Sequence, residues 1–235
     1  MALLPIQAQE RIQRFRLPED ALRSLVGRLA PTWYLRYAEL IANHQVPNFG
    51  RESKGKPMLL DPVLSPPLAF NDSHDGAYVL LGITRGQGAV IGVDLMQLPS
   101  DPLPVQEGIS EQLLPSEKRA LALDISTRDR ARRVTTFWTV KEGYTKAIGQ
   151  GIGFGLERIQ VDLDERGDVG MVSVDGSDVR DNGWRWKCGW LGRDEGYGWV
   201  VYWKIDEMEE GGVEEVTNQV KEISWDEFLR QFDEI

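Results

Sequence analysis

The residues whose types and spacing could do chemistry are Asp94, Glu142 and Lys146. Asp94 ends the apolar stretch Val90–Val93, which is typical of a strand that finishes in an acid. Glu142 and Lys146 are four residues apart, so on a helix they lie side by side on one face. If Asp94 and Glu142 meet in the fold, their carboxylates form a hard-oxygen site suited to a magnesium ion that also holds phosphate oxygens.

The element that must position Glu142 and Lys146 is a helix over residues 137–149. Its apolar residues recur at spacings of three and four, and Gly149 is a natural stop after its last turn. The apolar stripe consists of Phe137, Val140, Tyr144 and Ile148. From these residues alone, Glu142 and Lys146 could also be an ordinary ion pair on an exposed helix face, and both interpretations stay open.

Two segments, in this order, resemble the paired signature of a known family. They are Ile91-Gly92-Val93-Asp94 and Trp138-x-x-Lys141-Glu142-x-x-x-Lys146. Together they resemble the 4′-phosphopantetheinyl transferases, and more closely the two-lobed surfactin-synthetase-activating type. Many relatives carry a second acid two residues after the aspartate. Met96 stands there in this chain, as in the aminoadipate-reductase-activating branch of the family.

The resemblance implies an α+β fold of two similar lobes related by a pseudo-twofold axis. Each lobe is then a small antiparallel sheet packed with helices, with the active site in the cleft between the lobes. We expect an N-terminal lobe at 1–98, a proline-rich linker at 99–104 and a C-terminal lobe at 105–206. Residues 207–235 are expected to be an acidic tail with a terminal helix. The family has a first strand before the Arg11 region, and we expect the N-terminal lobe to lack it.

Local patterns predict further elements. Residues 5–43 are expected to be helical, with a break or kink at Pro31. The strand at 77–83 and the strand that carries Asp94 are expected to form a hairpin. A capping box that begins at Ser224 is expected to open a last helix. Further short strands are expected near 170–174, 184–191 and 199–205.

The reaction that the resemblance implies moves 4′-phosphopantetheine from coenzyme A to a serine of a carrier domain, releasing adenosine 3′,5′-bisphosphate. The acyl or peptidyl carrier would belong to a fatty acid synthase, a polyketide synthase, a nonribosomal peptide synthetase or aminoadipate reductase. Mg²⁺ would be held by Asp94 and Glu142, with water and diphosphate oxygens completing its coordination.

The resemblance also implies roles for the other charged residues. Glu142, or Glu117 through a water molecule, would accept the serine proton. Lys146 and His74 would stabilise charge on the phosphate oxygens, and Lys141 would steer the same group. Taken alone, Glu117 is equally consistent with an acid favoured by the first turn of a helix. A lone histidine such as His74 at a strand start is more often only a polar residue without a functional role.

Basic and polar motifs match the family's contacts to coenzyme A. The motif at 51–57 would surround the nucleotide end, and the motif at 71–74 would bind the phosphates. The expected contacts are Arg11, Arg51, Lys54, Lys56, Asn71, Ser73, His74, Lys141 and Lys146. Asp72 replaces the usual Ile or Leu of the family, which is acceptable if its side chain faces water. Without the resemblance, the motif at 51–57 is more typical of a solvated hairpin, and the arginines of residues 5–43 are equally consistent with a solvated helix face.

Composition bounds the function. The chain has 235 residues, of which 41% are hydrophobic and 27% are charged, as in globular proteins. Its net charge of −10 argues against general nucleic-acid binding. It contains no run of about 18 apolar residues and no signal peptide pattern, so we expect no membrane span. A single cysteine excludes an internal disulfide and fits a reducing, cytoplasmic location.

The arginine-rich segment 127–133 is expected either to be a solvated first turn or to dock an acidic carrier domain. Two other functions stay open beside the transferase. One is a non-catalytic relative that binds coenzyme A or a carrier, and the other is a magnesium-dependent hydrolase of coenzyme A or nucleotides. The family type implies a monomer.

Overall fold

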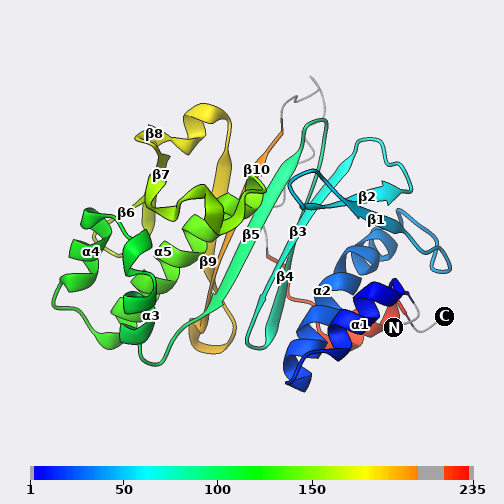
Figure 1. Ribbon diagram of the computed structural model, residues 1–235, viewed down its shortest axis with the longest axis horizontal. Coiled ribbons are helices and arrows are strands. Elements are labelled where there is room, and N and C mark those ends of the chain that lie inside the picture. Colours follow the sequence, from blue (N-terminus) through cyan, green and yellow to red (C-terminus); the bar gives the residue numbers. More distant parts are fainter. Residues whose placement is uncertain (1–2, 206–219, 233–235) are drawn as a thin grey trace.

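The computed structural model describes residues 3–205 and 220–232 (Figure 1). The helices are α1 (Ile6–Gln13), α2 (Pro18–Tyr37), α3 (Leu103–Gly108), α4 (Pro115–Ala122), α5 (Thr127–Ala147) and α6 (Trp225–Arg230). The strands are β1 (Asn48–Arg51), β2 (Pro57–Asp61), β3 (Leu68–Asp75), β4 (Tyr78–Arg85), β5 (Val90–Gln97), β6 (Ile159–Leu163), β7 (Val169–Val174), β8 (Ser177–Asp178), β9 (Arg185–Leu191) and β10 (Tyr197–Lys204). Among the described helices, none is both long enough and apolar enough to cross a bilayer.

Strand β5 lies at the centre of the molecule. It pairs antiparallel with β10, which pairs with β9, so this sheet has the order β5-β10-β9. The antiparallel pair of β3 and β4 lies beside β5. Helix α5 packs on β5 and β10, and α2 packs on β3 and β4 at the other side (Figure 1). The fold is therefore α+β, with small antiparallel sheets packed by helices, as expected.

The predicted hairpin between residues 77–83 and the Asp94 strand is wrong. β4 pairs with β3, and β5 pairs with β10, so that Asp94 lies opposite Val200. The continuous apolar stretch before Asp94 is typical of a strand buried on both faces, and pairing with β10 places β5 between α5 and β3. β5 also extends to Gln97, so Asp94 lies inside the strand and not at its end. The division into lobes at 99–104 stays a prediction.

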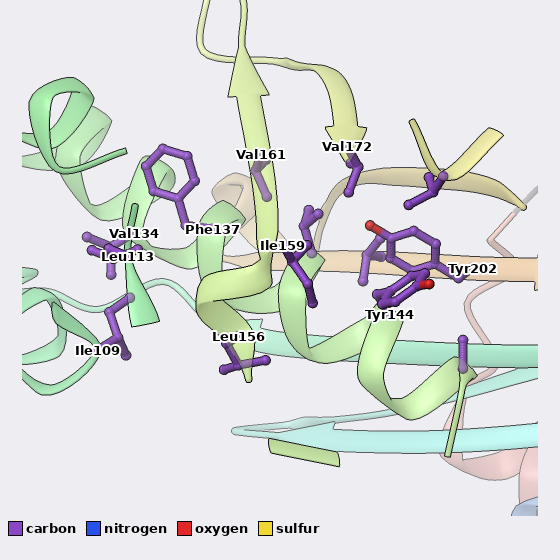
Figure 2. Packing of buried hydrophobic residues seen from close by; sticks show 14 of the residues in the cluster. Ile109, Leu113, Val134, Phe137, Tyr144, Leu156, Ile159, Val161, Val172 and Tyr202 are labelled. Carbon is purple, nitrogen blue, oxygen red and sulfur yellow. The ribbon is translucent and has the colours of Figure 1, made fainter. Parts of the chain in front are cut away.

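The helix predicted over 137–149 is confirmed as the C-terminal half of α5. Phe137, Val140 and Tyr144 are buried in a cluster that α5 shares with β6, β7 and β10 (Figure 2). The Tyr144 ring meets the Tyr202 ring edge to face, with centroids 5.6 Å apart. Such aromatic pairs contribute about 0.5–1.5 kcal/mol beyond the burial of their area. This cluster therefore fixes α5 against the C-terminal strands.

Helix α2 is continuous through Pro31, so a break there is wrong and the alternative, a kink, stays a prediction. The helix is continuous from Pro18 to Tyr37, although proline removes one helical hydrogen bond. Leu29 and Trp33, on either side of Pro31, are buried in the same apolar cluster. Burial on both sides therefore outweighs the local cost of the proline.

The C-terminal helix α6 returns to the N-terminal part of the chain (Figure 1). The Ser224 half of the predicted capping box is confirmed, since the Ser224 hydroxyl accepts the Glu227 amide hydrogen at 3.2 Å. The Phe228 ring stacks on Trp33 with centroids 6.0 Å apart, and Arg36 donates to the carbonyl oxygen of Gln231 at 2.8 Å. Helix α6 is thus part of the packing of α2. The acidic tail predicted from residue 207 lies, up to residue 219, outside the described residues.

The last turn of α5 lies unusually close to β5. A Cβ atom on Gly92 would overlap the backbone nitrogen of Ala147, and one on Gly143 would overlap the side chain of Val200. Both glycines have ordinary backbone angles, so they are needed for space and not for a turn. The absence of side chains at these two positions sets the distance between the helix and the sheet.

We predict that Gly92→Ala lowers the free energy of unfolding by about 1–3 kcal/mol, because the added methyl group must push α5 away from β5. Gly108→Ala is the control, since a Cβ there meets no atom within 4 Å. That control is expected to be neutral, or more stable by about 0.4–1 kcal/mol. Urea denaturation measures both changes, and equal stability of the two variants would contradict the close approach.

Candidate active site

Three polar side chains from β3, β5 and α5 meet beside this close approach. The Asp94 Oδ1 atom accepts hydrogen bonds from Ser73 Oγ at 2.9 Å and from Lys146 Nζ at 2.6 Å. Lys146 Nζ also lies 3.0 Å from Ser73 Oγ. Asp94 and Ser73 are buried, whereas the Lys146 side chain is 24% exposed. The group is therefore held by the core and open to solvent on the lysine side.

Glu142 joins this group from one turn earlier on α5. Its Oε1 atom lies 3.8 Å from Lys146 Nζ, so one ammonium group is shared by the carboxylates of Asp94 and Glu142. Burial raises the pKa of Asp94, and Lys146 opposes that rise. Burial and the charge of Asp94 raise the pKa of Glu142, while Lys146 and a hydrogen bond with the Trp138 side chain oppose it. Glu142 and Lys146 therefore form the ion pair expected on a helix face, and they also lie beside Asp94 as the functional interpretation requires.

This donor set fits a divalent cation. The Asp94 Oδ2 atom is buried and has no hydrogen-bond partner among the described residues, although such atoms are normally paired. A cation there would satisfy Asp94 Oδ2 and reduce the repulsion between Asp94 and Glu142. Within residues 3–205 and 220–232, no group of three or more His, Cys, Asp or Glu side chains is placed to hold a metal. Two carboxylates would leave most of the coordination to water and substrate, which suits Mg²⁺.

The motif at 71–74 serves the fold as well as the site. Asn71 Oδ1 accepts the amide hydrogen of Val93 at 2.8 Å, so this side chain ties β3 to β5. Ser73 points to Asp94, and His74 is exposed on β3. A contact of Asn71 with coenzyme A stays a prediction, although the side-chain oxygen of Asn71 already accepts the hydrogen bond from Val93.

The Asp72 side chain, which was expected to be acceptable in the motif if it faced water, is half-buried. Its carboxylate packs on α2, where a Cβ on Gly27 would lie 3.1 Å from Asp72 Oδ2. Burial raises the pKa of Asp72, and the positive charges of Lys146, His74 and Arg28 oppose that rise. Asp72 is accommodated because Gly27 leaves space and three basic groups lie near it.

The basic residues expected to bind coenzyme A have different surroundings. Arg11 on α1 is exposed, and so are Arg51 and Lys54 in the β1–β2 hairpin. Arg51 Nη1 donates to the carbonyl oxygen of Gly55 at 2.6 Å, which orders the hairpin turn. Lys56 is buried, and its Nζ donates to a backbone carbonyl of α5. Three of these four cations are therefore accessible to a ligand.

Glu117 and Lys141 lie apart from this group, in the core of the C-terminal part. Glu117 Oε2 and Lys141 Nζ are 2.6 Å apart, and both side chains are 1% exposed or less. Glu117 also accepts the amide hydrogens of Leu114 and Val161, and Lys141 donates to the carbonyl oxygen of Gln112. This geometry does not support a proton-accepting role for Glu117 or a coenzyme A contact for Lys141, because protein partners occupy both groups.

The arginines of segment 127–133 are engaged within the chain. Arg132 forms an ion pair with Glu195 at 2.7 Å and lies over the Trp190 ring. The other three donate to backbone carbonyl oxygens, with pairs Arg128–Asp194, Arg130–Leu123 and Arg133–Ala120. These contacts attach α5 to its neighbours, which weakens the expectation that the segment is a free docking surface.

Sequence reasoning missed two features of the site. It did not foresee the bond from Lys56 to the last carbonyl group of α5, because Lys56 is 91 residues away from that group in the sequence. It also missed the burial of Asp72 against α2. Both contacts join segments that are distant in sequence, so no local pattern indicates them.

The comparisons with known proteins cover most of the chain. Residues 1–85 match a family model described as 4′-phosphopantetheinyl transferase, N-terminal, and residues 90–197 match one described as 4′-phosphopantetheinyl transferase superfamily. A 4′-phosphopantetheinyl transferase, pptA, of Paxillus involutus is 35% identical over 191 residues, which are 76% of this chain and 70% of that protein. The L-aminoadipate-semialdehyde dehydrogenase-phosphopantetheinyl transferase of Mus musculus is 30% identical over 189 residues, 73% of this chain and 58% of that protein.

Solved structures show a more distant likeness. A complex titled Chronobacterium ammoniagenes ACPS-CoA is 19% identical, with a TM-score of 0.36, and the match covers 51% of this chain and 98% of that chain.

We predict that Lys141→Met lowers the free energy of unfolding by about 3–5 kcal/mol, because it leaves the Glu117 carboxylate buried without its cation. Combining it with Glu117→Gln should cost less than the sum of the two single changes. Lys118→Met is the matched control, since Lys118 is exposed on α4, and it should change stability by less than about 0.5 kcal/mol. Urea denaturation of the four variants measures these free energies. If the losses of the two single variants simply add up in the double variant, Lys141 and Glu117 do not stabilise each other.

Proposed function

The chain belongs to the 4′-phosphopantetheinyl transferase superfamily, and we propose that it transfers the 4′-phosphopantetheine group of coenzyme A to a serine of a carrier domain. Asp94 and Glu142 would hold Mg²⁺, and the carrier would be an acyl or peptidyl carrier domain. Met96, in the place of a second acid, favours the aminoadipate-reductase-activating branch. A cytoplasmic location and a monomeric state stay predictions from the sequence.

The observation that carries this proposal is the contact between the two signature segments. Asp94 comes from the first segment and Lys146 from the second, and their charged atoms are 2.6 Å apart. Glu142 shares the same ammonium group. Two carboxylates and a partly exposed lysine at one point are the groups needed to bind a diphosphate through a cation and to accept a proton.

In the proposed reaction, the serine Oγ of the carrier attacks the β-phosphorus of coenzyme A. The bond from this phosphorus to the bridging oxygen breaks, and adenosine 3′,5′-bisphosphate leaves with the electron pair. Glu142 accepts the serine proton, while Lys146 and the exposed His74 stabilise charge on the phosphate oxygens. Bound Mg²⁺ would neutralise charge on the diphosphate. Ser73 and Asp94 hold the Lys146 ammonium in place before the substrate arrives.

One incubation tests this function against its two rivals. The protein is mixed with coenzyme A, Mg²⁺ and an apo carrier domain, and the carrier is weighed by mass spectrometry. A mass gain of one phosphopantetheine group supports transfer, and chelation of Mg²⁺ should abolish that gain. Release of the bisphosphate without carrier modification would indicate a hydrolase. No change with any of several carriers would indicate a binding protein.

We predict that Glu142→Gln lowers turnover about 100-fold or more, because the amide can neither accept the serine proton nor bind a cation as a carboxylate does. Coenzyme A should still bind, since the exposed cations of the β1–β2 hairpin are unchanged. Glu107→Gln, at an exposed position of α3, is the control and should leave turnover unchanged. Normal turnover of Glu142→Gln in the carrier assay would remove Glu142 from the mechanism.

A further inference from the structure

The β1–β2 hairpin carries two exposed cations and one buried cation. Arg51 and Lys54 are exposed, whereas Lys56 is only 8% exposed. Lys56 Nζ donates a hydrogen bond of 3.1 Å to the carbonyl oxygen of Ala147. Ala147 is the last residue of α5, so this bond connects the hairpin to the end of the helix that carries Glu142 and Lys146. One short motif thus contains cations in two different environments.

The bond from Lys56 satisfies a requirement of the helix end. The last carbonyl groups of a helix have no partner within it, and the helix dipole places partial negative charge there. An ammonium group bound to such a carbonyl is favourable for both reasons. Burial lowers the pKa of Lys56, and the nearby carboxylate of Glu52 opposes this change. The buried carbonyl and the buried ammonium group therefore satisfy each other.

The hairpin also lies near the turn that follows α5. A Cβ on Gly149, in the turn after α5, would lie 3.7 Å from Lys54 Cβ and 3.9 Å from Lys56 Cβ, which is ordinary van der Waals distance. On β5, Gly92 meets the backbone of Ala147 directly. The last turn of α5 is thus contacted by the hairpin and by β5. Lys146 lies in that turn, directly before the residue that both elements touch.

We propose that Lys56 is a positioning residue for Lys146 and not a ligand of the coenzyme A phosphates, an inference that rests on the proposed transferase function. Lys56 fixes the end of α5, so that Lys146 Nζ stays within reach of Asp94 and Ser73. The phosphates of the nucleotide are bound by the exposed cations of the hairpin, Arg51 and Lys54. The same hairpin therefore binds the nucleotide through Arg51 and Lys54 and positions Lys146 through Lys56.

The experiment compares Lys56→Met with Lys54→Met in the full chain. Methionine keeps the apolar stem of the lysine but cannot donate to a carbonyl. Two quantities are measured: kcat for transfer to an apo carrier, and the Kd for adenosine 3′,5′-bisphosphate by calorimetry. For Lys56→Met, kcat should fall about tenfold or more while Kd changes less than about twofold, because misplacement affects the reacting group and not the nucleotide. For Lys54→Met, Kd should rise about fivefold or more, with less effect on kcat.

Two results would overturn the proposal. One is a Kd for Lys56→Met that rises as much as that of Lys54→Met, whatever happens to kcat. The other is an unchanged kcat for Lys56→Met. Lys56→Arg keeps a donor and should retain more turnover than Lys56→Met. If the methionine variant does not fold, Lys56→Gln, with a shorter donor, is measured in the same way.

The transferase function and the role of Lys56 can fail separately. If the wild-type chain modifies no carrier, the transferase function fails. The bisphosphate affinities of the two lysine variants still decide whether Lys56 binds phosphate.

Discussion

The close approach of α5 to β5 is the constraint on which the site depends. Gly92 and Asp94 are two residues apart on a strand, so they face the same side of the sheet. At Gly92 the missing side chain admits the backbone of Ala147, and two residues later Asp94 meets Lys146. Gly92 thus leaves space for the backbone of α5, and Asp94 forms an ion pair with Lys146 of the same helix. A larger residue at position 92 would separate the two halves of the site.

Neighbouring residues of α5 have opposite roles because successive helical positions point about 100° apart. Lys141 is directed into the C-terminal core, where Glu117 and a backbone carbonyl oxygen accept two hydrogen bonds from its ammonium group. Glu142 is directed towards β5 and shares a partly exposed lysine with Asp94. Lys141 and Glu117 are buried and bonded to each other, whereas Asp94 Oδ2 is buried without a hydrogen-bond partner among the described residues. The ion pairs of Lys141 and of Lys146 illustrate that difference.

The sequence was informative where the signal was local and poor where it was not. The helix around Glu142 and the cap at Ser224 were predicted because periodicity and capping need only neighbouring residues. The sequence analysis expected Asp94 to meet Glu142, whereas in the structure both carboxylates lie beside Lys146, and the Asp94–Lys146 bond was not foreseen because nothing between positions 94 and 146 specifies it. The pairing of β5 with β10, the continuity of α2 through Pro31 and the burial of Asp72 were missed. Each of them is decided by packing against a distant segment, which overrides local preference.

The return of α6 to α2 has a consequence for the order in which the chain acquires its structure during synthesis. Arg36 bonds to the carbonyl of a residue 195 positions later, and the rings of Trp33 and Phe228 stack beside that bond. At ribosomal rates the last of these groups emerges roughly 10 to 40 seconds after the first, since elongation proceeds at about 5–20 residues per second. During that interval Trp33 lacks the ring that finally covers it. The earliest helices to leave the ribosome are therefore among the last parts to be fully covered, and a nascent chain would offer this aromatic surface to chaperones until its final helix arrives.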